Sequence, residues 1–145
     1  MTPRNPKLYG RVIGWDDIPE TRLRAGVRRK VYATDEVMIA HHRLAVGMDL
    51  NPHSHEDFDQ LVLITEGRCN YYVDGVANPM GPGDMLLVPR GAEHYIEPLE
   101  EPCVNVDIFV PPRADFAPSL AYVDDLDGPD EPDGPDGPDE PGEHP

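Results

Sequence analysis

Two histidines that stand two residues apart, His53 and His55, lie in the stretch "NPHSHEDFDQ" at positions 51–60. In an extended chain, residues i and i+2 point to the same side, so both rings can face one point. Pro52 disfavours a helix here, which separates this pair from the i, i+4 histidines of helical metalloproteases. Neutral imidazoles are common ligands of divalent ions, so the stretch indicates part of a metal site.

The same stretch contains the candidates for a further ligand: Glu56, Asp57, Asp59 and Gln60. Gln60 opens the run "QLVLITEG" and shares a face with Val62 and Ile64, which places its amide at the rim of an apolar interior. The three acids fall in the turn before this run, outside the mouth of a cavity. His94 begins the short run "HYIEP", so three histidines and one amide oxygen from adjacent strands could converge.

The elements that must position these groups are short strands separated by turns rich in Gly and Pro. Strand-like runs cover 31–37, 37–46, 60–67, 68–75, 85–88, 94–98 and 103–112. Residues 15–26 hold one turn of helix at most, and the chain shows no amphipathic helix of ten residues or more. This pattern predicts an all-β sandwich or barrel with a modest core and one small-molecule cavity.

The run "CVNVDIFVPP" alternates most cleanly. One face carries the aliphatic residues Val104, Val106, Ile108 and Val110, and the other carries Cys103, Asn105, Asp107 and Phe109. The apolar walls of the cavity are expected among Val62, Ile64, Leu86, Val88, Val106 and Ile108.

The spacing of these residues resembles the two motifs of the cupin family. The first motif is matched by Gly47, His53, His55, Gln60 and Gly67, and the second by Gly83, Pro89, Gly91 and His94. The resemblance spans about residues 27 to 113 and implies an all-β, single-domain cupin, an antiparallel β-sandwich or jelly-roll barrel. It also implies a metal ion held by His53, His55, Gln60 and His94.

The sequence departs from the cupin motifs at Gln60, where the family has Glu, and at Pro98, where it has Asn. Two alternatives to a Gln60 ligand stay open: a decayed site without metal, or Asp59 as the fourth ligand. With Gln60 in place, all ligands are neutral and the ion keeps its +2 charge. That favours Lewis-acid chemistry with Zn²⁺, while Ni²⁺, Fe²⁺ and Mn²⁺ remain possible.

Among cupins, the N-terminal run from Leu8 and the ending "VDIFVPPRADF" resemble the monocupin polyketide cyclases and, for the ending, the sugar-acid cupins acting on unsaturated uronates. The resemblance implies a metal-dependent cyclase that promotes aldol cyclisation and aromatisation of a poly-β-ketone in aromatic polyketide (antibiotic) biosynthesis. The substrate is a small polyketide intermediate, free or carrier-bound. The alternatives are a cupin dioxygenase using Fe²⁺ or Ni²⁺, a sugar-acid cupin converting unsaturated uronates, and a non-catalytic ligand sensor.

The choice between these substrates depends on charge in the cavity. A uronate carboxylate needs a cation, and the strand-borne candidates are few: Arg43, Arg68 and Arg90. The apolar walls therefore favour the polyketide.

His42 is the candidate general base and Tyr71 a candidate donor to a second substrate oxygen. Of His41 and His42, one must face inward, and a buried hydrogen-bonded histidine is the default reading for either. Tyr71 and Tyr72 present the same choice.

The chain of 145 residues carries 12 basic and 28 acidic side chains, a net charge of −16. Residues 117–145 are predicted to be a disordered acidic tail, because 124–145 hold ten acids among Gly and Pro. The barrel is expected over 27–116. Residues 1–26, with Tyr9 and Trp15, are expected at a homodimer interface.

The composition argues against a nucleic-acid partner. The sequence shows no apolar run near 18 residues and no secretory pattern near its start, so we expect a cytoplasmic protein without a membrane span. Cys69 and Cys103 are expected to be free thiols there, with one disulfide as the alternative.

Overall fold

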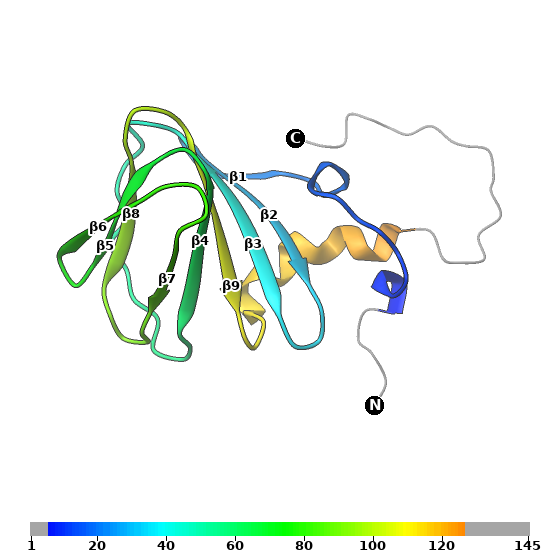
Figure 1. Ribbon diagram of the computed structural model, residues 1–145. Helices are drawn as coiled ribbons and strands as arrows, with labels where there is room; N and C mark the ends of the chain where they lie inside the picture. Colours follow the sequence, from blue (N-terminus) through cyan, green and yellow to red (C-terminus); the bar gives the residue numbers. More distant parts are fainter. Residues whose placement is uncertain (1–5, 127–145) are drawn as a thin grey trace.

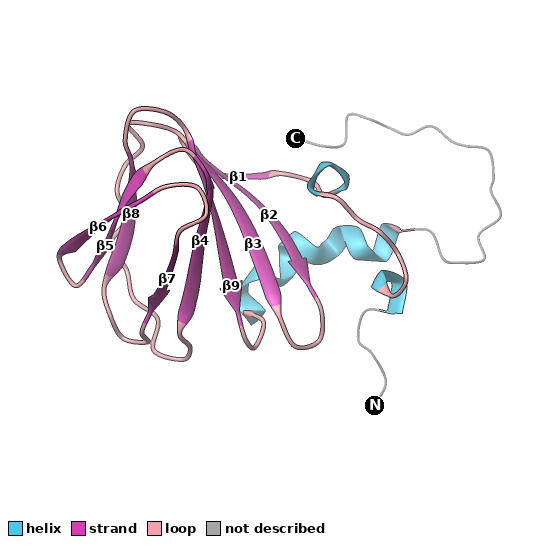
Figure 2. Cartoon of the chain, viewed as in Figure 1, coloured by secondary structure: helices cyan, strands magenta, loops and turns pink. Residues whose placement is uncertain are grey.

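The computed structural model describes residues 6–126, and residues 1–5 and 127–145 lie outside the described part. Within it, nine strands form two antiparallel sheets that face each other (Figure 1, Figure 2). The larger sheet has the order β1-β2-β3-β9-β4-β7 and the smaller one β6-β5-β8. The strands are β1 (Thr21–Arg24), β2 (Val27–Ala33), β3 (Met38–Leu44), β4 (Gln60–Glu66), β5 (Cys69–Val73), β6 (Val76–Met80), β7 (Met85–Val88), β8 (His94–Pro98) and β9 (Cys103–Phe109). The predicted all-β, single-domain antiparallel sandwich is confirmed.

Most of the strands were predicted, with two exceptions. β1 forms the edge of the larger sheet, ahead of the boundary expected at residue 27. β6 pairs with β5 through the turn at Asp74 and Gly75, whose φ values of 49° and 82° suit a tight hairpin. β6 contains Asn78 and Pro79, residues that are uncommon in strands, which explains why its sequence gave no strand signal.

The core lies between the two sheets. One cluster joins residues of both sheets: Val62, Ile64, Cys69, Tyr71, Met80, Val88, Ala92 and Cys103. Both cysteines are buried free thiols, as expected. A second cluster holds Val31, Ala33, Met38, Ala40, Phe109 and Phe116. The inner face of β2 and β3 therefore packs partly against the segment after β9 and not only against the smaller sheet.

That segment is a 3-10 helix, η3 (Ala114–Asp125), which runs beside β2 (Figure 1). Phe116 and Val123 are buried, and the Tyr122 hydroxyl donates to the backbone oxygen of Val31 at 2.7 Å. The expectation of a disordered tail from residue 117 therefore differs from the structure over 117–126, where the chain forms this 3-10 helix. Apolar side chains spaced between the acids and prolines supply enough burial to order the segment. The rest of the predicted tail lies outside the described residues.

The N-terminal segment includes two short 3-10 helices, η1 (Pro6–Leu8) and η2 (Trp15–Asp17), the latter being the single predicted turn. The Trp15 ring packs on His41 with centroids 4.8 Å apart, and Lys30 Nζ donates to the Trp15 backbone oxygen at 2.9 Å. Trp15 thus has a place on the outer face of its own sheet. The homodimer itself stays a prediction. No helix among residues 6–126 is long and apolar enough to cross a membrane.

Candidate metal centre and cavity

Three histidines meet at one end of the sandwich. Each offers one ring nitrogen, and these atoms lie within 4.8 Å of one another. His53 and His55 lie in the loop before β4, and His94 is the first residue of β8. The backbones of His53 and His94 exchange two hydrogen bonds, with N···O distances of 3.1 and 2.8 Å. This single bridge attaches the loop to β8 and explains how residues 41 positions apart share a site.

The hydrogen bonds of two of these rings fix which nitrogen is free. His53 Nδ1 lies 2.6 Å from the backbone oxygen of Asn51, and His94 Nδ1 lies 3.0 Å from that of Ala92. A carbonyl oxygen only accepts, so Nδ1 carries the proton in both rings and Nε2 keeps its lone pair. Such backbone contacts orient metal-ligating histidines in many proteins.

Two buried nitrogens of the cluster, His55 Nε2 and His94 Nε2, have no hydrogen-bond partner among the described residues, and neither has the buried Oε1 of Gln60, which lines the same cavity as His53 and His55. Leaving acceptors buried and unsatisfied costs free energy, and a cation between them would remove that cost. The donor set of imidazoles and one amide oxygen suits Zn²⁺ or a similar divalent ion. The residues therefore fit a metal ion, whose identity they leave open.

Protonation does not compete for these nitrogens near neutral pH. Burial lowers the pKa of His55 to about 4, with smaller contributions from the positive charges of Arg113 and the other histidines. Burial also lowers the pKa of His94. Both rings are therefore neutral, the form that binds a metal.

The acids of the opening stretch do not join the cluster, which is the only such group found among the described residues. The Asp59 carboxylate accepts hydrogen bonds from the backbone N and the Nε of Arg90, at 3.0 and 3.3 Å, and its side chain is 47% exposed. The structure therefore disagrees with Asp59 as the fourth ligand, because its carboxylate is held outside the cavity.

Gln60, the first residue of β4, is only 4% exposed and lines the same cavity as His53 and His55. Its Nε2 donates to the hydroxyl of Tyr71 at 3.4 Å, and its side chain also hydrogen-bonds the carboxyl of Asp107, which lowers the pKa of that carboxyl as a donor does. The Tyr71 ring stacks on His94 at 6.2 Å with an interplanar angle of 11°. Tyr71 is thus the inward tyrosine, next to two of the predicted ligands.

The structure shows which residue of each neighbouring pair, His41 and His42 or Tyr71 and Tyr72, faces the cavity. His42 lines the cavity, whereas His41 faces outward against Trp15. Burial lowers the pKa of His42 to about 3, with a further contribution from Arg29, so the ring is neutral. Tyr72, the neighbour of Tyr71, donates to Glu97 at 3.1 Å outside the cavity.

Asp107 is a cavity residue that the sequence reasoning did not single out. It is 5% exposed, accepts from Asn105 Nδ2 at 3.1 Å, and lies 3.4 Å from His42 Nδ1. Burial raises its pKa to about 7, although the hydrogen bonds from Asn105 and Gln60 act in the opposite direction. The alternation of 103–112 carried the signal, because it placed this acid on the same face as Phe109. A carboxyl group with such a pKa can donate or accept a proton near neutral pH.

The cavity has a volume of about 250 Å³ and its lining is mixed rather than apolar. None of the expected walls lines it: Val62, Ile64 and Val88 lie in the core, and Leu86 packs against it. Val106 and Ile108 share the outer face with Leu63 and Leu61, their cross-strand partners.

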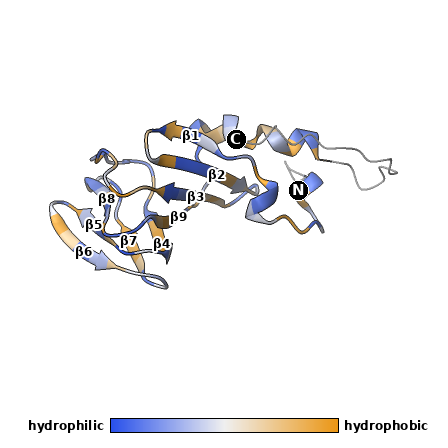
Figure 3. Ribbon diagram, turned by 90° about the horizontal axis from the view of Figure 1, so that it is seen from above, coloured by the Kyte–Doolittle hydropathy of each residue, from blue (hydrophilic) through white to orange (hydrophobic). Residues whose placement is uncertain are grey.

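The cations that line the cavity are not the three candidates named from the sequence. Arg43, Arg68 and Arg90 do not line the cavity, but Arg24, Arg29 and Arg113 do. Arg29 lies on the inner face of β2, two residues from buried Val27 and Val31. Hydrophilic residues of β2 and β3 thus contribute to the cavity, and Figure 3 shows a hydrophilic stretch in each of these two strands beside apolar parts.

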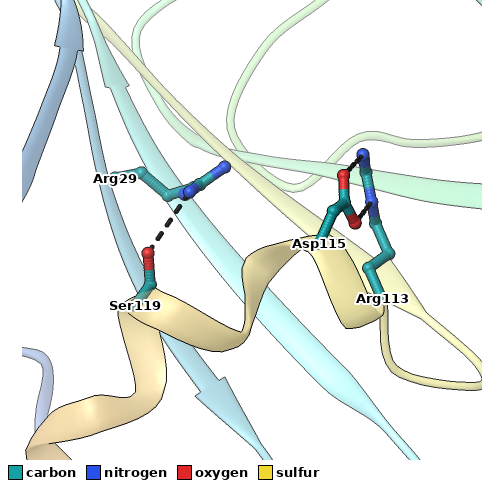
Figure 4. A network of polar contacts seen from close by, with 4 residues as sticks. All are labelled: Arg29, Arg113, Asp115 and Ser119. Atoms are coloured by element: carbon teal, nitrogen blue, oxygen red, sulfur yellow. Dashed lines mark hydrogen bonds and ion pairs between the residues drawn. The ribbon is translucent and has the colours of Figure 1, made fainter.

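Arg29 and Arg113 are held by η3 (Figure 4). Arg113 donates to Asp115 through Nε and Nη2, at 3.0 and 2.6 Å. Arg29 Nη2 donates to Ser119 Oγ at 3.2 Å, while its Nε is buried without a partner among the described residues. Burial lowers the pKa of Arg29, and the nearby charge of Arg113 lowers it further. The site therefore presents an unsatisfied guanidinium donor beside a second positive charge.

A two-sheet sandwich with three histidines converging at one end defines the class of protein. The cupin-domain family model matches residues 40–109, and the chain belongs to the cupin family. The chain is similar to pectin degradation protein KdgF of Dickeya dadantii, with 30% identity over 102 residues that cover 70% of this chain and 93% of that protein.

Two solved structures extend the comparison. KdgF from Halomonas sp. is 25% identical with a TM-score of 0.68, covering 74% of this chain and 98% of that one. The polyketide cyclase RemF from Streptomyces resistomycificus is 17% identical with a TM-score of 0.61, covering 72% and 81% of the two chains. At that identity, the likeness to RemF shows the fold alone. Both groups of cupins that the sequence resembles therefore occur among the similar proteins, and these include enzymes.

Proposed function

We propose that this chain is a metal-dependent enzyme that converts an unsaturated uronate, a monosaccharide with a carboxylate next to a carbon–carbon double bond. This proposal reverses the order of preference drawn from the sequence. The observation that carries it is the charge of the cavity, where Arg24, Arg29 and Arg113 line a space with one acid, Asp107, whose pKa burial raises to about 7.

A carboxylate is the natural partner of the unsatisfied donor on Arg29. Guanidinium groups bind carboxylates through parallel N–H donors, and such charged hydrogen bonds are among the stronger polar contacts in proteins. A partly buried pair of cations without an anion is unfavourable, and Asp115 neutralises only part of it by its contact with Arg113. A substrate carboxylate would complete the charge balance.

The size of the cavity supports the same substrate. Sites for drug-sized ligands enclose about 300–1,000 Å³. A volume of about 250 Å³ fits one sugar ring and is small for a long, folded polyketide. The relative at 30% identity is a pectin degradation protein, and pectin is built from uronic acids.

The reaction that these groups support is an isomerisation. A proton leaves the anomeric hydroxyl, the ring C–O bond breaks as the aldehyde forms, and the resulting enolate collects a proton on carbon to give a keto acid. His53, His55, Gln60 and His94 would hold a divalent ion that polarises a substrate oxygen. Asp107 would accept and return the proton, with neutral His42 3.4 Å away as its neighbour. In this role Asp107 replaces His42 as the candidate base.

Turnover of a purified 4,5-unsaturated galacturonate tests the proposal, followed as loss of ultraviolet absorbance of the conjugated double bond. We expect rapid conversion by the wild-type protein and at least a hundredfold loss in Asp107→Asn, as for the removal of a general acid–base group. Arg90→Gln, at an exposed site outside the cavity, is the matched control. An unchanged absorbance with metal-loaded wild-type protein would contradict the proposal.

The polyketide cyclase is the second candidate. The observation that favours it is the aromatic part of the lining, Tyr71, Tyr95, Phe109 and Phe116, on which a conjugated chain could stack. Cyclisation of a synthetic poly-β-ketone thioester by a protein that leaves the uronate untouched would reverse the order of the two candidates. No specific contact in the cavity favours the dioxygenase or the sensor.

A further inference from the structure

We infer that Asp107 and Tyr71 act as positioning residues that fix the Gln60 side chain with its oxygen toward the histidines and select an amide over a carboxylate at this position. The inference rests on the proposed metal site but not on the identity of the substrate. It begins from one asymmetry: the Gln60 nitrogen has partners, whereas its buried oxygen has none among residues 6–126.

The orientation of an amide follows from its neighbours, because its oxygen accepts and its nitrogen donates. The Gln60 side chain hydrogen-bonds Asp107 and lowers the pKa of its carboxyl, as a donor does, and Tyr71 Oη lies 3.4 Å from Gln60 Nε2. Turning the amide over would place its oxygen against the acceptor oxygens of Asp107. The ionised Asp107 carboxylate, the form present at pH 8, therefore requires the nitrogen, and the oxygen is left to face the cluster.

Asp107 is itself fixed, so its influence on Gln60 is directional. Asn105 Nδ2 donates to Asp107 Oδ1 at 3.1 Å, and both side chains lie on the inner face of β9, two residues apart. Asp107 is also the cross-strand partner of Val62, two residues beyond Gln60 on β4. Buried partners held this closely leave little freedom for rearrangement.

Tyr71 acts on the cluster in two ways. Its hydroxyl faces Gln60 Nε2, and its ring stacks on His94. It is 2% exposed, and burial raises its pKa, so the hydroxyl stays neutral. A single side chain from β5 thus contacts two residues of the proposed ligand set, one on β4 and one on β8.

A glutamate at position 60 would meet Asp107 as a second buried carboxyl group, and like charges in a buried site disfavour each other strongly. The neighbours of Gln60 therefore account for the glutamine that replaces the glutamate of the cupin motif. They preserve a neutral ligand set, and with it the full +2 charge of a bound ion.

A double-variant cycle on the chelator-treated, full-length protein at pH 8 tests the orientation without any metal. Gln60→Glu sets two carboxyl groups against each other, and Asp107→Asn puts an amide, with one acceptor oxygen and one donor nitrogen, where a carboxylate accepts from both Asn105 and Gln60. In the double variant, the amide introduced on β9 could donate to the carboxylate introduced on β4 and accept from Asn105. We expect each single variant to lower the midpoint of thermal unfolding by several degrees and the double variant to recover at least half of the summed loss. Additive losses would overturn the inference.

Binding of Co²⁺ as a probe ion, measured by its visible spectrum and by competition with a chelator, tests the effect on the site. Tyr71→Phe keeps the stacked ring but removes the hydroxyl that accepts from Gln60. We expect the Kd of this variant for Co²⁺ to rise about tenfold, the lower end of the range for residues that hydrogen-bond metal ligands. In a Gln60→Ala background, the same change should have no further effect. Tyr72→Phe, on the same strand but bonded to Glu97, is the control and should bind as wild type does.

The outcomes separate this inference from the proposed function. Wild-type protein that binds no Co²⁺ would remove the metal site, while the unfolding cycle would still report on Gln60. A wild-type Kd in Tyr71→Phe, or a rise that persists without Gln60, would overturn the role of Tyr71.

Discussion

Arg29 and Arg113 lie over the same aromatic ring, with their guanidinium carbons 3.8 and 4.1 Å from the centroid of Phe116. The two residues come from the second strand and from the segment after the last strand, 84 positions apart. A phenyl ring between them offers each cation a favourable face and limits their repulsion. The arrangement keeps two positive charges at the cavity of a protein whose net charge is −16.

Replacing Arg29 should therefore affect substrate binding more than folding. Arg29→Met removes the unsatisfied donor, and we expect KM for the uronate to rise about 10- to 100-fold, the equivalent of one hydrogen bond to a charged group. The methyl ester of the same substrate, which has no charge, should show little change between the variant and the wild type. Arg28→Met, on the outer face, is the matched control. An equal rise for acid and ester would contradict a role in carboxylate binding.

Metal removal should abolish activity and lower stability together. A ligand present at 100 times its Kd stabilises the folded state by about 2.7 kcal/mol. For a domain of this size that corresponds to a rise on the order of 10 °C in Tm. We expect Zn²⁺ added to chelator-treated protein to produce this shift and restore turnover. His94→Ala should lose both effects, and His41→Ala, on the outer face, should keep them. A shift that survives in His94→Ala would place the ion elsewhere.

The convergence of the histidines was predictable because His53 and His55 stand two residues apart and the second cupin motif supplies His94. His53, His55 and Gln60 lie within eight residues, and strand parity together with the cupin spacing is enough to direct them to one side. The parity of 103–112 likewise separated the two faces of the last strand correctly. What parity could not give was the location of each face, inside or outside, since that depends on how the two sheets close.

The cations were missed for a physical reason. An inward charge between Val27 and Val31 contradicts the rule that charged residues face solvent, and only a closed cavity with η3 beside it makes Arg29 favourable. Arg113 follows the last strand, where the sequence has no alternation from which the direction of the Arg113 side chain could be predicted. η3 itself contains Pro118 and several acids, so its order comes from tertiary contacts and not from helix propensity.

The pH dependence of stability should show the burial of His42. Burial lowers its pKa to about 3 in the folded protein, against 6.5 ordinarily, so below pH 6.5 only the unfolded chain takes up the proton. The contribution of neutral His42 is therefore present above pH 6.5 and is lost as the pH falls toward 3. In metal-free protein, the free energy of unfolding of wild type relative to His42→Asn should fall by at most about 2 kcal/mol between pH 7.5 and 5. Urea denaturation at the two pH values measures it, and a difference independent of pH would contradict the burial.

The segment after the last strand should prove to be part of the folded domain as far as residue 126. Phe116 is 7% exposed and contacts Phe109, with ring centroids 5.8 Å apart, as well as two of the three cavity arginines, Arg29 and Arg113. Removing a buried phenylalanine side chain typically costs about 3–5 kcal/mol. Phe116→Ala should lose a large part of that amount in urea denaturation and raise KM by releasing Arg29.

A chain ended after Leu126 should match the full-length protein in both measurements. A chain ended after Arg113 should be less stable than Phe116→Ala, because it also loses the hydrogen bond from Tyr122 to Val31. If the chain ended after Arg113 were as stable as the full-length protein, η3 would not belong to the domain and the anchoring of Arg29 would need another explanation.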